Sequence, residues 1–185
     1  GLRGLTQTIP AEPDRAVRQA RQLETLATAG IEELQRLVAG LHPPQLDELG
    51  LLAALRWFAQ ETTNRYNLPI RVSGRANGEQ VPEEIRLVLF RITQEAITNT
   101  VRHAQATQVQ ITLDVSASLI RLVVADDGKG FDVNAVLGGS EPQCIGLLGM
   151  IERSGLVGGE CEIRSAPGAG TTVEVSIKRV AEQTT

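Results

Sequence analysis

Residues 119–130 read LIRLVVADDGKG, an apolar run that ends in two carboxylates and two glycines. The run predicts a buried strand, and Gly128 and Gly130 permit a turn in which a ligand can lie against bare backbone. When ionised, Asp126 only accepts hydrogen bonds, which suits an exocyclic amine such as that of adenine. It would repel the carbonyl oxygen that guanine has at the same place. Taken alone, the stretch is also compatible with a surface turn or a calcium loop.

A second polar group lies on the helix predicted for QEAITNTVRHA, residues 94–104. Glu95 and Asn99 are four residues apart and share one helical face, and Arg102 and His103 follow one turn later. The Asn99 carbonyl is a hard oxygen ligand suited to Mg²⁺, and Glu95 could polarise a hydroxyl, a water or an imidazole. An exposed polar stripe is the alternative for this helix.

A third glycine-containing stretch is IGLLGM, residues 145–150, after the loop FDVNAVLGGSEPQC. We expect Gly146 to precede a helix whose free N–H groups could hold phosphates. The loop has the composition of a lid, and an ordinary connecting loop is the alternative.

The fourth stretch is SAPGAGTTVEV, residues 165–175. Gly168 and Gly170 would make a turn, and the hydroxyls of Thr171 and Thr172 could reach a phosphate. A plain hairpin turn is the alternative.

The elements between these motifs predict an α+β fold. Helices and strands do not alternate regularly, so we expect a two-layer sandwich: a mixed β-sheet with helices on one face, preceded by a partial helical hairpin. The predicted helices span residues 14–40, 46–66, 82–104 and 146–157, and the predicted strands span 68–74, 108–115, 119–126, 159–166 and 171–180. The first helix has the apolar spacing of a coiled-coil seam over residues 27–41. A boundary is expected near residues 66–69.

The composition narrows the class of protein. With 185 residues and a net charge of −4, the chain has no basic footprint, so we expect no nucleic-acid partner. No run approaches the about 18 apolar residues of a membrane span, so no membrane contact is expected. Cys144 and Cys161 are too few for a disulfide framework, which favours a reducing, cytoplasmic compartment. The start without Met suggests a piece of a longer protein, whose parent could be membrane-anchored.

The order of the four motifs resembles the N, G1, G2 and G3 boxes of one ATP-binding fold. Sensor histidine kinases, type II topoisomerases, ninety-kilodalton heat-shock chaperones and mismatch-repair ATPases share this Bergerat-type fold, and the resemblance covers about residues 68–180. RITQEAITNTVRHA, DDGKGFD, GLLGMIER, SAPGAGTTVEV and the connector LHPPQLDELGLLAAL are most similar to histidine kinases related to nitrate/nitrite sensors and the thermosensing desaturase regulator.

The resemblance implies roles for individual residues. Asp126 would accept from the adenine amine, in a pocket shaped by Gly128 and Gly130, and Asn99 would hold Mg²⁺. Arg102 and His103 would contact the phosphates or the ribose, and Thr171 would support the adenine or the phosphates. Gly146, Leu147 and Gly149 would form the end of the lid. Glu95 would have a catalytic role, polarising the acceptor imidazole.

The resemblance also implies an organisation and partners. Residues 1–45 would be part of a dimerisation and phosphoacceptor region, 46–67 a connecting helix, 68–180 the catalytic ATP-binding domain and 181–185 a tail. The complete protein would be a homodimer that transfers the γ-phosphoryl of Mg-ATP to a histidine, for relay to a response regulator.

Three departures from the family pattern concern the lid, the linker and the acceptor. Cys144 stands where the lid motif often begins with glycine, and His42 stands where the linker has arginine. The chain lacks the His-Asp or His-Glu dipeptide of the family's phosphoacceptor. We expect the acceptor to precede Gly1, since His42 follows the first helix and His103 belongs to the nucleotide motif. An anti-sigma-factor-like serine kinase and a nucleotide-binding regulatory module without transfer activity stay open as alternatives.

Overall fold

The computed structural model describes residues 17, 44–76, 81–137 and 142–179. The helix predicted over 14–40 and its apolar seam therefore lie outside the described residues, Val17 excepted. Residues 44–185 form one compact unit. Within the described residues, no helix is both long enough and apolar enough to span a membrane.

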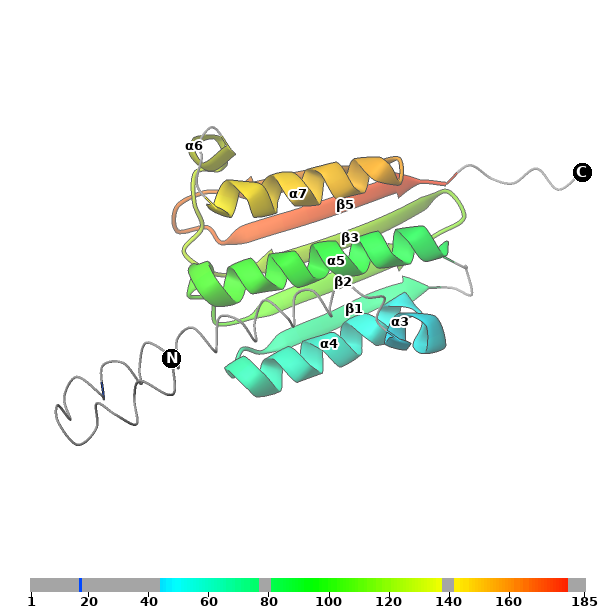
Figure 1. The fold of residues 1–185 in the computed structure, drawn as a ribbon, viewed down its shortest axis with the longest axis horizontal. Coiled ribbons are helices and arrows are strands. Elements are labelled where there is room, and N and C mark those ends of the chain that lie inside the picture. Colours follow the sequence, from blue (N-terminus) through cyan, green and yellow to red (C-terminus); the bar gives the residue numbers. More distant parts are fainter. Residues whose placement is uncertain (1–16, 18–43, 77–80, 138–141, 180–185) are drawn as a thin grey trace, which may run out of the picture. The chain divides into compact units, whose positions relative to one another are not determined.

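The unit is a five-stranded mixed sheet covered by helices on one face (Figure 1). The strand order is β1-β2-β3-β5-β4; β1 and β2 are parallel and the other neighbours are antiparallel. The α+β sandwich predicted from the sequence is confirmed. The elements in chain order are α3 (Pro44–Leu49), α4 (Leu51–Tyr66), β1 (Ile70–Ala76), α5 (Glu83–Asn99), the π-helical turn η1 (Thr100–Ala104), β2 (Val109–Val115), β3 (Leu119–Asp126), α6 (Val133–Leu137), α7 (Pro142–Leu156), β4 (Gly159–Ser165) and β5 (Thr171–Lys178).

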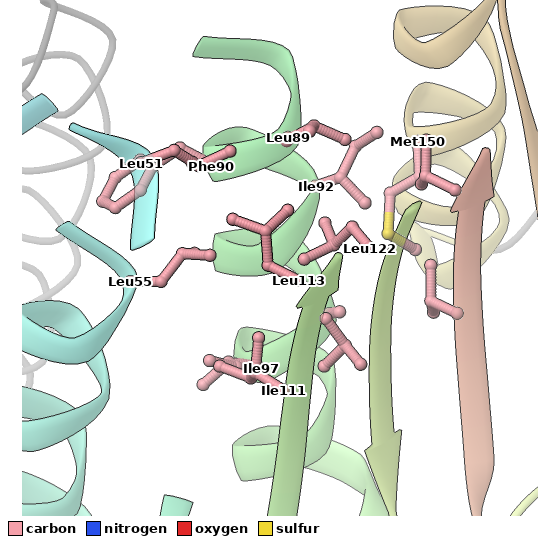
Figure 2. Close-up of a cluster of buried hydrophobic side chains, with 14 of the residues drawn as sticks. Leu51, Leu55, Leu89, Phe90, Ile92, Ile97, Ile111, Leu113, Leu122 and Met150 are labelled. Carbon is pink, nitrogen blue, oxygen red and sulfur yellow. The ribbon is translucent and has the colours of Figure 1, made fainter. Parts of the chain in front are cut away.

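The core lies between the sheet and the helices α4, α5 and α7. Successive residues of a strand point to opposite faces, so the alternating apolar positions of β2, β3 and β5 all face the helices. Figure 2 shows side chains of α5 packed over those of the central strands. Phe90 of α5 is 1% exposed and meets Phe58 of α4 edge to face, with ring centroids 5.6 Å apart. This packing positions α5, which brings Ala96 and Asn99 to the candidate site.

The segment before the sheet differs from the single helix predicted over residues 46–66. Helix α3 begins at Pro44, and Gly50, which has φ +76°, separates it from α4. Proline suits a first helical turn because its missing N–H would be unpaired there, and glycine tolerates positive φ. Leu46 and Leu55 are fully buried in the same core as the sheet. The boundary expected near residues 66–69 therefore falls inside one compact unit.

The loop predicted over residues 131–144 also differs. It contains the short helix α6, whose second and third residues, Asn134 and Ala135, donate their N–H groups to the Asp132 carboxylate at 2.9 and 3.1 Å. Helix α7 then begins at Pro142, so Gly146 is the fifth residue of that helix. Only the first four N–H groups of a helix lack an intrahelical partner. The prediction that Gly146 precedes this helix is therefore wrong, and any free N–H groups of α7 lie before Gly146.

Candidate functional site

A cavity of about 130 Å³ opens where the end of α5, the turn η1, the end of β3 and α7 meet. Its apolar wall is formed by side chains of the core, among them Val124, Leu147, Met150 and Val173. The predicted site residues that line it are Asn99, His103, Asp126, Gly130, Leu147 and Thr171. The structure thus brings groups from four separate motifs to one cavity.

Asp126 is the last residue of β3 and is half-buried at the cavity wall. Its Oδ1 accepts a hydrogen bond from the Gly128 N–H at 2.8 Å, and its Oδ2 accepts one from the Thr100 hydroxyl at 3.0 Å. A carboxylate has about four acceptor sites. Two of them therefore stay available to a ligand while the other two orient the group.

Asp127, the second carboxylate of the stretch, points elsewhere. It accepts hydrogen bonds from the Thr107 N–H at 2.7 Å, the Thr107 hydroxyl at 2.5 Å and the Gln108 N–H at 3.0 Å. These bonds, that of the Thr107 hydroxyl above all, lower the pKa of Asp127 below its ordinary value. Asp127 thus closes the turn before β2. No group of three or more metal-binding side chains of His, Cys, Asp or Glu occurs among the described residues.

The glycines of the stretch serve close packing of backbone segments. A Cβ on Gly128 would lie 2.5 Å from the Ala104 carbonyl oxygen, and the Lys129 N–H donates to that oxygen at 2.8 Å. Gly130 has φ +58°, and a Cβ there would collide with the Ala166 carbonyl oxygen. Gly130 lines the cavity, whereas the buried Gly128 supports the turn against η1.

The polar residues of α5 and η1 separate into two groups. Asn99 and the exposed His103 line the cavity, whereas Glu95 and Arg102 do not. Glu95 is half-buried, and a Cβ on Gly146 of α7 would collide with its Oε1 and lie 3.7 Å from the Asn99 amide nitrogen. The lack of a side chain at Gly146 therefore lets α7 approach the two polar groups of α5.

On α7, Leu147 and Met150 face the cavity and Gly149 does not. A Cβ on Gly149 would meet the guanidinium of Arg153, at 3.1 Å from Nη1. On β5, Thr171 lines the cavity opposite Asp126, with which it is paired across the two strands. The Thr171 hydroxyl lies 3.2 Å from that of Ser165.

Several lining residues were not singled out from the sequence, notably Thr100, Lys129, Phe131 and Met150. Thr100 is the first residue of the π-helical turn. The i→i+5 hydrogen bonds of such a turn span one residue more than those of an α-helix, which shifts the following side chains around the axis. The periodicity of an α-helix therefore does not predict that Thr100 faces the cavity. Its position directly after Asn99, within the helix motif, was the available signal.

The comparisons with known proteins agree with this geometry. Residues 83–181 match the family model described as histidine kinase-, DNA gyrase B-, and HSP90-like ATPase. The chain is 32% identical over 170 residues to the signal transduction histidine-protein kinase/phosphatase DegS of Brevibacillus brevis, covering 92% of this chain and 43% of that protein. It is 34% identical over 164 residues to the sensor histidine kinase LiaS of Bacillus subtilis, covering 89% of this chain and 44% of that protein.

The chain thus spans less than half the length of these relatives. Among solved structures, the histidine kinase domain of the Erythrobacter litoralis EL346 blue-light activated histidine kinase is similar, with a TM-score of 0.53 and 23% identity over 69% of this chain and 64% of that one. At that identity the likeness concerns the fold.

Proposed function

Because the chain belongs to the family of histidine kinase-, DNA gyrase B- and HSP90-like ATPases, we propose that it is the catalytic ATP-binding part of a two-component sensor histidine kinase. The relatives named histidine kinases match about nine-tenths of the chain, more than the ATPase model covers. The similarity therefore extends into the segment before α5, which favours the kinases over the other branches of the family.

The observation that carries the proposal is one cavity with an apolar wall, a fixed carboxylate and an amide at its rim. Ligand pockets for aromatic rings combine apolar faces with a few oriented polar groups. Asp126 would accept from the adenine amine, between the apolar wall of Leu147 and the Thr171 side of the sheet. Gly130 would shape the pocket beside the base, and Gly128 would support the turn from behind.

The phosphates would lie toward the Asn99 side of the cavity. Mg²⁺ usually binds one or two protein oxygens and shares the rest of its shell with phosphate oxygens and water. The single amide oxygen of Asn99, half-buried at the cavity, fits that requirement. A bound Mg²⁺ would neutralise phosphate charge and help to align the transferred group. Arg102 and His103, in the turn beyond Asn99, would contact phosphates or ribose.

Glu95 and α7 complete the proposed site. Glu95 would polarise the acceptor imidazole from its position against Gly146. Gly146, Leu147 and Gly149 would form the end of the lid, with Gly146 acting through close helix packing and not through a free N–H group. Phosphoryl transfer mainly requires alignment and charge neutralisation, which these side chains would supply.

In the complete protein, the γ-phosphoryl would pass to a histidine before Gly1 and then to an aspartate of a response regulator. Residues 1–45 would belong to the dimerisation and phosphoacceptor region of a homodimer, 46–67 would connect it to the catalytic domain at 68–180, and 181–185 would be a tail. The ATP-binding unit would be cytoplasmic, where its nucleotide is.

Titration of the 185-residue chain with Mg-ATP and Mg-GTP tests the site. We expect a clear preference for ATP, loss of that preference in Asp126→Asn, and loss of the magnesium dependence in Asn99→Ala. Asp127→Asn is the matched control, because the neighbouring carboxylate serves the turn at Thr107 and should leave the preference unchanged. Equal affinity for both nucleotides, or none for either, would contradict the assignment.

A protein serine kinase is the second candidate, because the chain contains no His-Asp or His-Glu dipeptide. The two classes differ in the bond that they form, since phosphohistidine is lost in acid and phosphoserine is stable there. Acid treatment of the phosphorylated full-length product therefore separates them. If a separately supplied acceptor helix and labelled ATP give no transfer at all, the chain would be a nucleotide-binding regulatory module.

A further inference from the structure

We propose that Thr100 is a positioning residue for base recognition: its hydroxyl holds the Asp126 carboxylate in the orientation that meets the adenine amine. The inference rests on the proposed function, and concerns a residue that none of the four motifs assigns. Thr100 is 4% exposed and its Oγ1 lies 3.0 Å from Asp126 Oδ2. Both residues line the cavity.

The carboxylate of Asp126 is held from two sides. The Gly128 N–H donates to Oδ1 from the turn that follows β3, and the Thr100 hydroxyl donates to Oδ2 from η1. A single bond from Gly128 would still allow the carboxylate to rotate and exchange its two oxygens. The second bond, from a different element, removes that freedom before a ligand arrives, and pre-organisation of this kind raises affinity.

The single proton of the Thr100 hydroxyl has two acceptors within reach. Its Oγ1 lies 3.0 Å from the Ala96 carbonyl oxygen and 3.0 Å from Asp126 Oδ2. The Ala96 carbonyl already accepts the backbone N–H of Thr100, so it is satisfied without the hydroxyl. An ionised acceptor also makes the stronger hydrogen bond. The Thr100 hydroxyl therefore donates its hydrogen bond to the Asp126 carboxylate.

Thr93 shows the ordinary arrangement on the same helix. It is fully buried, and its hydroxyl donates to the Leu89 carbonyl oxygen at 2.9 Å, one turn back. Thr93 does not line the cavity. The Thr100 hydroxyl also lies within hydrogen-bonding distance of the preceding turn, but it alone of the two reaches a carboxylate. This contrast makes Thr93 a matched control for removal of a buried helix hydroxyl.

The first experiment measures the affinity of the 185-residue chain for Mg-ATP and Mg-GTP by calorimetry. Thr100→Val keeps the shape of the side chain and removes the hydroxyl, so we expect affinity for ATP to fall about tenfold and affinity for GTP to change little. Thr100→Ser should keep the ATP affinity, and Thr93→Val should match the wild type. An equal loss in Thr100→Val and Thr100→Ser would overturn the proposal, because the hydroxyl would not be the cause.

A second measurement tests whether Thr100 acts through Asp126. The side-chain carboxyl ¹³C resonance of Asp126 should move in Thr100→Val and stay in place in Thr93→Val, without any nucleotide. In a double-mutant cycle, Thr100→Val should cost little additional ATP affinity in the Asp126→Asn background. Additive losses, or an unmoved resonance, would contradict the positioning role.

The outcomes separate this inference from the proposed function. If the wild-type chain binds no ATP, the proposed function itself fails. If it binds ATP with a preference that depends on Asp126, and Thr100→Val behaves as the wild type, only the role of Thr100 fails. Should Thr100→Val not fold, as judged by its circular dichroism spectrum, the smaller Thr100→Ala variant removes the same hydroxyl and carries the same expectation.

Discussion

Replacement of Glu174 by Gln should destabilise the folded unit at neutral pH and lose its effect near pH 2. Glu174 lies on the sheet face away from the helices, between two arginines of neighbouring strands. Its Oε1 is 2.6 Å from Arg121 Nε and its Oε2 is 2.7 Å from Arg164 Nη2. These hydrogen bonds, that of Arg121 first, lower the pKa of Glu174 from 4.5 to about 2.

The sign of the effect follows from this depressed pKa. The unfolded chain takes up the proton more readily than the folded one, so the stabilisation is full above pH 4.5 and disappears as the pH falls toward about 2. At 1.36 kcal/mol per pKa unit, the difference sets an upper bound of about 3 kcal/mol. The arginine side chains are 44% and 51% exposed, so solvent screens both pairs. We therefore expect about 1 kcal/mol at pH 7.

Urea denaturation followed by circular dichroism between pH 7 and pH 2.5 measures the difference in unfolding free energy between wild type and Glu174→Gln. Glu162→Gln is the control on the same face. Glu162 has a 64% exposed side chain, its Oε2 lies 2.6 Å from Arg164 Nη1, and it lies opposite Glu174 in the strand register. Its loss should change stability by less than about 0.5 kcal/mol. Equal stabilities of Glu174→Gln and wild type at pH 7, or a difference that persists unchanged at pH 2.5, would refute the reasoning.

Three further substitutions test the turn, the backbone and the core. Asp127→Asn should lower the urea midpoint, because the side chain can accept fewer of the hydrogen bonds from Thr107, and a midpoint equal to that of the wild type would contradict this. Gly170→Ala should lower the melting temperature, since Gly170 has φ +68° and a Cβ would collide with the Asp126 carbonyl oxygen. Phe90→Ala should cost about 3–5 kcal/mol in urea denaturation, and a loss under 1 kcal/mol would mean that the ring is not packed as described.

Local sequence patterns predicted most of the secondary structure. The run LIRLVVAD, residues 119–126, became β3 with the same bounds, and QVQITLDV became β2 from Val109. These predictions hold because successive side chains of a strand point to opposite faces of the sheet, so burial of one face leaves an alternating apolar pattern in the sequence. The order and chemistry of the four motifs likewise predicted the ATPase family, which the family match confirms.

Helix ends were less predictable. The break at Gly50 falls between Leu49 and Leu51, where the local apolar pattern continues. Helix α7 begins at Pro142, before the apolar run that starts at Ile145. In η1 the helix changes from α to π geometry without any proline or glycine in Thr100–Ala104. Because of these shifts, Gly146 packs against α5 and does not offer a free N–H.

The residue types of the site and their order along the chain are legible in the sequence by itself, because each short motif carries its own chemistry. The different roles of Asp126 and Asp127 cannot be read from the sequence, since adjacent identical side chains differ only in what surrounds them. One meets Thr100, 26 residues earlier, and the other closes the turn at Thr107. Such partners are set by strand register and by the packing of α5 against the sheet. These are properties of the folded chain, which brings distant segments within hydrogen-bonding distance.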